Sequence, residues 1–96
     1  MSFIVSEHAL ADLEDIWEYS SRSWGAEHAN LYIDLIVLRF AWLAEHRGLW
    51  RRRQDLADGL FSWTEKSHVI YFSERANRIE IVRVLHGSMD PRSNLV

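Results

Sequence analysis

The 96-residue chain contains no cysteine, no long apolar run, and no repeated or low-complexity stretch. Without cysteine it has no disulfide, no thiol chemistry and no thiolate metal site, and a cytoplasmic protein is expected. Because no apolar run approaches the ~20 residues of a membrane helix, and the N-terminus does not resemble a signal peptide, we expect no membrane association. The length predicts a single domain over residues 1–96.

The composition is that of a globular protein, with 48% apolar and 26% charged residues. The net charge of −3 argues against general nucleic-acid binding, and no direct specific binding to nucleic acid is expected. Residues 1–46 hold eight acidic residues and two arginines, whereas residues 47–96 hold nine basic and six acidic residues. This asymmetry indicates either two faces with different partners or simply a solvated helical surface beside a sheet.

The first half of the chain predicts a short strand followed by two helices. The apolar residues 3–5 predict the strand, and Ser6 is a suitable N-cap for a helix that runs to about residue 23. Gly25 is expected to end this helix. Four apolar residues recur in it at helical spacing, namely Leu10, Leu13, Ile16 and Trp17.

The second predicted helix, residues 26–46, carries two apolar stripes. One stripe consists of Ala29, Ile33, Ile36, Phe40 and Leu43. The other, on nearly the opposite side, consists of Leu31, Leu35, Leu38 and Trp42. A helix on a sheet needs only one stripe, so the second either packs in a helix hairpin, which we favour, or forms a docking groove for a partner helix.

The second half predicts a loop at residues 47–59 and then three strands at residues 60–65, 68–73 and 78–86. The short turns between the strands indicate an antiparallel meander. The fold class is therefore α+β: a short N-terminal strand, an antiparallel two-helix hairpin, and a three-stranded meander that completes one sheet.

Three segments resemble one known family. They are "ALADLEDIWEYSSRSWGAEHANLYI" at residues 9–33, "HVIYF" at residues 68–72, and "IEIVRVLHGSMD" at residues 79–90. Their order and spacing are similar to those of the ParE toxins of bacterial type II toxin–antitoxin systems, within the wider ParE/RelE superfamily. The resemblance implies a RelE/ParE-like fold and a toxin encoded beside a ParD-like antitoxin. ParE members are associated with inhibition of DNA gyrase, whereas RelE members cut messenger RNA on the ribosome.

The residues that RelE-type enzymes use for RNA cleavage are mostly absent. Cleavage through the 2′-hydroxyl needs a base, an acid and cations around the phosphate. The basic loop is present as Arg51, Arg52 and Arg53. Phe61 and Met89, however, stand where RelE-type enzymes have arginines, and the tail contains no tyrosine. We therefore expect a non-catalytic gyrase inhibitor without a cofactor. A ribosome-dependent mRNA endoribonuclease and an inactive partner that only holds its antitoxin are the alternatives.

The histidines and tryptophans give weaker signals. The five histidines form no ligand pair at helical spacing, so no metal site is predicted. His86 has the chemistry of an acid or base, but a bond to a backbone carbonyl at the strand end is the simpler expectation. The tryptophans are expected mostly in the core. The exception is Trp50, which either anchors the arginine loop or meets a partner.

Arg83 is unusual because it lies between two valines in the last strand, where an unpaired charge would be costly. It alternates with Ile79, Ile81 and Leu85, which predicts that all four share one strand face. The first helix offers Asp12, Asp15 and Glu18 as acidic partners, of which Asp12 is our choice. We favour a structural ion pair between Arg83 and Asp12 over a direct role in toxicity.

The resemblance also directs attention to two partner surfaces. We expect the antitoxin to bind the second stripe (Leu31, Leu35, Leu38 and Trp42) and the arginines Arg51, Arg52 and Arg53. The C-terminal end is where toxicity is usually placed in this family. There Gly87 permits a sharp turn and Pro91 is expected to prevent a helix, which leaves an exposed target-binding segment containing His86, Ser88, Met89, Asp90 and Arg92.

Overall fold

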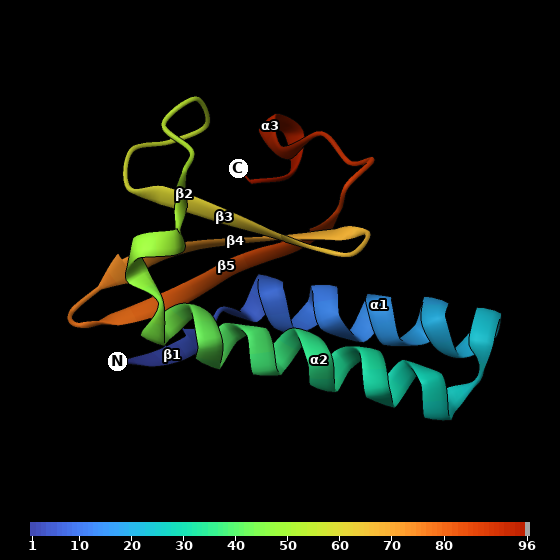
Figure 1. The fold of residues 1–96 in the computed structure, drawn as a ribbon. Helices are drawn as coiled ribbons and strands as arrows, with labels where there is room; N and C mark the ends of the chain where they lie inside the picture. The colour runs from blue at the N-terminus through green and yellow to red at the C-terminus, as the bar shows by residue number, and fades with distance from the viewer. Residues whose placement is uncertain (96) are drawn as a thin grey trace.

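Residues 1–95, which the computed structural model describes, form a mixed five-stranded sheet with a helix hairpin against one face (Figure 1). The elements are β1 (Ser2–Val5), α1 (Glu7–Trp24), α2 (Ala26–Glu45), the 3₁₀ turn η1 (Arg47–Leu49), β2 (Arg51–Arg52), β3 (Leu60–Glu65), β4 (His68–Arg75), β5 (Arg78–His86) and α3 (Pro91–Asn94). None of the helices in these residues combines the length and apolar character that crossing a bilayer demands.

The strands lie in the order β1-β5-β4-β3-β2, with β1 parallel to β5 and the other neighbours antiparallel. The predicted fold class and meander are confirmed. The sheet has one strand more than predicted, because Arg51–Arg52 pairs with β3 inside the expected loop. The expected turn at residues 74–77 is also shorter, because Ala76 and Asn77 both adopt positive φ, as a two-residue hairpin turn requires, and β4 continues to Arg75.

The helix boundaries follow their capping residues. The Ser6 hydroxyl accepts a hydrogen bond from the Ala9 amide at 3.0 Å and so begins α1 as predicted. Gly25, with φ of 94°, joins α1 to α2 without a longer loop. The hairpin is also tied by a bond from Trp17 Nε1 to Asn30 Oδ1 at 2.8 Å.

The main core lies between the sheet and the helix hairpin. The first stripe of α2 packs there as predicted, with Ile36, Phe40 and Leu43 fully buried. The spacing predicted α1 correctly, but of its four apolar residues only Leu13 and Ile16 are buried, and Leu10 and Trp17 are exposed. The residues of α1 that face the core recur at positions three or four apart, and they are Ala9, Asp12, Leu13, Ile16 and Ser20.

A smaller cluster covers the opposite face of the sheet. Leu60, Tyr71 and Leu85 are its buried members. The loop between β2 and β3 contributes Leu56, and the C-terminal end contributes Leu95. Figure 1 shows α3 and the C-terminus on this face, away from the helix hairpin. The C-terminal segment is therefore packed on the sheet and does not simply extend into solvent.

A β-bulge in β5 changes the predicted face of Arg83. Tyr71 pairs with Arg83 and Phe72 pairs with Ile81, so Val82 is the extra residue. Ile81 and Val84 consequently both join the core under the helices, while Leu85 joins the opposite cluster. The expectation that Arg83 and Leu85 share a face with Ile79 and Ile81 was wrong, because it assumed uninterrupted alternation.

The expectation that Pro91 prevents a helix was also wrong. Pro91 is the first residue of α3, a position where its fixed φ and missing amide proton cost nothing. Asp90 caps this helix by accepting from the Arg92 amide at 3.0 Å. The segment after β5 is thus a folded turn and short helix.

Candidate functional site

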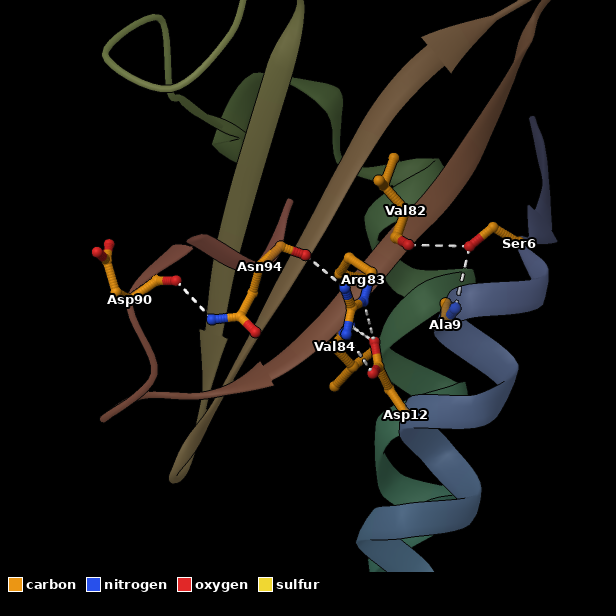
Figure 2. Close-up of polar contacts among 8 residues, drawn as sticks. All are labelled: Ser6, Ala9, Asp12, Val82, Arg83, Val84, Asp90 and Asn94. Carbon is orange, nitrogen blue, oxygen red and sulfur yellow. Dashed lines mark hydrogen bonds and ion pairs between the residues drawn. The ribbon is translucent and has the colours of Figure 1, made fainter. Parts of the chain in front are cut away.

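Beyond the end of β1, the backbone groups on the edge of β5 bond to Ser6 and to Asp12 of α1 instead of to a strand (Figure 2). The amide of Ser6 bonds to the Ile81 carbonyl at 3.0 Å, and its hydroxyl donates to the Val82 carbonyl at 2.9 Å. Further along α1, the Asp12 carboxylate accepts from the Val84 amide at 2.9 Å. These contacts satisfy edge groups that a further strand would otherwise pair.

Asp12 also binds Arg83 with both carboxylate oxygens. Arg83 Nε lies 2.8 Å from Oδ2 and Nη2 lies 2.8 Å from Oδ1, so the guanidinium fork is matched by the carboxylate. The two side chains are only 19% and 11% exposed. The bond to Asp12 raises the pKa of Arg83, which therefore stays charged. The predicted pair is thus present, and its contribution to stability stays a prediction.

The third nitrogen of the guanidinium reaches the C-terminal segment. Arg83 Nη1 donates to the carbonyl oxygen of Asn94, at the end of α3 (Figure 2). The same segment is held internally by Asp90, whose carbonyl accepts from Asn94 Nδ2 at 2.7 Å. One arginine on β5 therefore contacts both α1 and α3.

A groove of about 720 Å³ lies between the helix hairpin, the start of β4 and the end of β5. Its walls are partly aromatic, with Tyr19 and Trp24 from α1 and Tyr32 from α2. Three of the expected target-binding residues also line it, namely His86, Ser88 and Met89. Asp90 and Arg92 lie beyond it, in the cap and first turn of α3.

A chain of polar contacts forms the sheet side of this groove. His68 and His86 are directly opposite each other on β4 and β5, with ring centroids 5.3 Å apart. The Tyr32 hydroxyl lies 2.6 Å from His68 Nδ1. His86 Nδ1 accepts from the Ser88 amide at 3.1 Å, so the neutral ring carries its proton on Nε2. His86 therefore accepts a bond from a backbone amide, and the expected bond to a backbone carbonyl was wrong.

The environment favours neutral groups in this cluster. Burial lowers the pKa of His68, and the neighbouring His86 lowers it further. Burial likewise raises the pKa of the Tyr32 hydroxyl. His68 and Tyr32 thus contribute uncharged hydrogen-bonding groups to the groove, whose lining also includes the charged side chains of Lys66 and Arg83.

Acidification is expected to destabilise the protein through His68. Its pKa is lower in the folded state than the ~6.5 of an unfolded chain, so folding favours the neutral ring. The stabilising contribution is complete above about pH 6.5 and is lost as pH falls through the folded pKa. Melting curves between pH 7.5 and pH 5 should show this loss. The decrease should be smaller in His68→Gln, and an identical pH profile in that variant would contradict the assignment.

The second stripe of α2 is divided between surface and core. Leu31 and Leu38 are 65% and 68% exposed, so the favoured expectation that they pack within the hairpin was wrong. Leu35 is half-buried. Trp42 is also half-buried, because it stacks on His46 at 4.2 Å and packs against Trp63. The exposed part of this stripe consists of Leu31 and Leu38.

The three arginines at residues 51–53 differ in exposure. Arg51 and Arg52 are exposed on β2, and Arg52 covers the ring of Phe61. Arg53 is partly buried and makes two bonds of 3.0 Å to Asp55, which raise its pKa. Their part in antitoxin binding, like that of the α2 stripe, stays a prediction.

The structure corrects the expectation for Trp24 and favours one of the two interpretations of Trp50. Trp24 is exposed at the tip of the helix hairpin and does not lie in the core. Trp50 packs against Phe61 and Phe72, and its Nε1 donates to the Leu43 carbonyl at 2.7 Å. Of the two interpretations of Trp50, the structure supports the anchoring of the loop.

The groove itself was not predicted from the sequence. His68 and Tyr32 were not singled out, because neither shows metal-ligand or catalytic spacing. The hairpin turn gave no signal, because its register would place His68 opposite Leu85, and only the bulge at Val82 brings His86 to that position. Among the residues that the structure describes, no three acidic or histidine side chains gather as metal ligands.

Comparison with known proteins identifies the family. Residues 3–91 match the family model described as the ParE toxin of the type II toxin–antitoxin system parDE. Toxin ParE1 of Caulobacter vibrioides is 38% identical over 91 residues, which are 95% of this chain and 94% of that protein. Toxin ParE of Escherichia coli is 30% identical over 95 residues, covering 98% and 92% of the two chains.

A solved structure shares the fold. The chromosomal ParDE TA system from P. aeruginosa contains a chain that superimposes with a TM-score of 0.78 at 23% identity. The match covers 90% of this chain and 95% of that one. At this identity the likeness is evidence for the fold alone, and it agrees with the α+β arrangement described above.

Proposed function

This chain belongs to the family of ParE toxins of type II toxin–antitoxin systems, and we propose that it inhibits DNA gyrase by binding. A cognate ParD-like antitoxin neutralises it, in the cytoplasm and without a cofactor. The observation that carries a binding mechanism is the state of Arg83. Its guanidinium is held by Asp12 and by the Asn94 carbonyl, so this cation of the last strand is not free to hold a phosphate.

Other positions agree with a binding inhibitor. Phe61 packs against Trp50 and Phe72, so an apolar contact stands where RelE-type enzymes have an arginine. Met89 lines the groove beside His86 and Ser88 and brings no charge. The combination offers apolar and uncharged polar contacts, which are the usual components of a protein interface.

The ribosome-dependent endoribonuclease remains the second candidate function. Arg51 and Arg52 are exposed on β2, and such cations favour contact with phosphates. The pair His68 and His86 has the chemistry of an acid and a base. Against this candidate, the wall of the groove formed by α1 carries Asp15, whose charge opposes an RNA backbone.

Two parallel assays distinguish these functions. Purified protein is added to a gyrase supercoiling reaction and to a translation reaction in which mRNA cleavage is followed. Inhibition of supercoiling with intact mRNA is expected. Cleaved mRNA with normal supercoiling would replace the proposal by the second candidate, and no effect in either assay would indicate an inactive antitoxin partner.

Truncation after Gly87 is expected to abolish gyrase inhibition while leaving antitoxin binding intact. The missing residues include Ser88, Met89 and α3, which form the proposed target-binding segment, whereas the main core lies on the other face of the sheet. Some stability should be lost because Leu95 leaves the smaller cluster. The measurement pairs the supercoiling assay with antitoxin titration. If the truncated protein still inhibits gyrase, the residues that bind gyrase lie outside the segment after Gly87.

The antitoxin is proposed to cover the exposed leucines of α2 and to approach the arginine loop. Replacing Arg51, Arg52 and Arg53 by glutamine should weaken antitoxin binding or toxicity by about tenfold, since exposed charge pairs contribute about 0.2–1 kcal/mol each. The loss should shrink as salt rises. Arg75→Gln with Arg78→Gln, which removes charge at the β4–β5 turn, serves as the control. If the triple variant and the parent bind the antitoxin with equal affinity at low salt, the arginines of the loop are solvated surface residues without a role in antitoxin binding.

A further inference from the structure

The short helix α3 depends on contacts outside itself. It has four residues, and isolated helices of this length are not stable in water. Asp90 caps its start, and Leu95, just after its end, packs among the apolar residues that cover Tyr71 and Leu85. The contact that ties its carboxyl end to the sheet is the bond from Arg83 to the Asn94 carbonyl.

The geometry at Arg83 explains why an arginine is needed there. Two nitrogens of the guanidinium face the Asp12 carboxylate, which fixes the plane of the group. The remaining Nη1 then points at Asn94, on the opposite side from α1 (Figure 2). The Asn94 carbonyl is at a helix carboxyl terminus, where carbonyls lack helical partners and a cation is favourable.

We infer that Arg83 is a positioning residue, which seats residues 91–95 against the sheet and thereby gives the target-binding segment its shape. Asp12 acts through it by setting the orientation of the guanidinium. This inference rests on the proposed placement of toxicity in the segment that follows β5. It extends the pairing of Arg83 with Asp12, because the same side chain serves the scaffold and the functional segment.

Lysine cannot replace arginine in this arrangement. An ammonium group is a single point charge, so it can approach Asp12 but cannot present a planar fork to Asp12 and a third donor to Asn94. Arg83→Lys should therefore keep most of the attraction to α1 and lose the contact with α3. Arg39→Lys is the matched control, because Arg39 and Glu65 form a comparable pair at 2.7 Å and 26% and 11% exposure, distant from α3 in the sequence.

The experiment measures backbone ¹⁵N order parameters, melting temperature, antitoxin affinity and gyrase inhibition on the full chain. In Arg83→Lys, the order parameters of residues 92–95 should fall from about 0.85 to below about 0.6, while those of α1 and β5 stay unchanged. Gyrase inhibition should be lost, and antitoxin binding should be kept. Arg39→Lys should leave residues 92–95 rigid and gyrase inhibition intact.

The outcomes separate this inference from the proposed function. If residues 92–95 stay rigid in Arg83→Lys, the positioning role is overturned, whatever happens to gyrase. If they become mobile and gyrase inhibition persists, Arg83 seats the segment but the segment does not carry toxicity, which contradicts the inference as a statement about toxicity. In that case the truncation after Gly87 should also still inhibit gyrase, and the placement of the target-binding surface would fail in both tests.

Discussion

Asp12→Ala should lower the free energy of unfolding by about 3 kcal/mol, the lower end of the range for breaking a buried ion pair. The alanine leaves Arg83 without its bidentate partner and the Val84 amide without an acceptor on the open edge of β5. For a domain of this size the melting temperature should fall by roughly 12–24 °C. Thermal and urea unfolding measure the effect directly.

Two further variants show which contact of Asp12 accounts for the loss of stability. Asp12→Asn removes the negative charge but keeps an oxygen that can accept from the Val84 amide, so its loss should be intermediate. Asp15→Ala removes an exposed acid from the same helix and should change stability by less than about 0.5 kcal/mol. Were Asp12→Ala no less stable than Asp15→Ala, the pair with Arg83 would not be a determinant of stability.

Arg83 also shows how far sequence reasoning extends. A buried cation needs an acid, and the acids of the first helix were enough to propose Asp12 among three candidates. The third contact was not predictable, because it depends on the bulge at Val82 and on the path of the C-terminal segment. A one-residue insertion in the pairing leaves no sign in the hydrophobic pattern.

The elements at the margins of the sheet were harder to predict from the sequence than its central strands. Closely spaced apolar residues identified β4 and β5, whereas β2 consists of two exposed arginines and shows no strand pattern. Pro91 was interpreted as a helix stop, although Asp90 before it is a strong N-cap signal and proline is favourable at the first helical position. In both places local chemistry is compatible with more than one structure, and tertiary contacts decide between them.

The groove was missed for a different reason. Its residues come from α1, α2, the β3–β4 turn and the end of β5, and no sequence segment contains more than a few of them. The tryptophans were expected mostly in the core, yet Trp24 is exposed at the rim of the groove, as is Tyr19. Exposed aromatic side chains beside a concavity are characteristic of binding surfaces, and only the tertiary arrangement reveals them.

Replacing Leu31 and Leu38 by alanine should weaken antitoxin binding by about 100-fold or more without unfolding the toxin. Each leucine loses about 1.5–3 kcal/mol of burial if the antitoxin covers it, and tenfold in affinity corresponds to about 1.4 kcal/mol. Both side chains are more than 60% exposed in the free chain, so stability should change little. Trp42 is unsuitable for this test, because it stacks on His46 and packs against Trp63.

The matched control for this variant replaces Leu10 and Leu49 by alanine. These leucines are 50% and 56% exposed, so the same number of carbon atoms is removed from comparable surface outside the α2 stripe. Titration of both variants with antitoxin compares the two surfaces directly. A loss confined to Leu31 and Leu38 places the antitoxin on α2, because a general effect of reduced surface hydrophobicity would weaken both variants alike. Equal affinity of both variants and the parent would mean that the antitoxin binds elsewhere, and the groove beside Trp24 would then be the next surface to test.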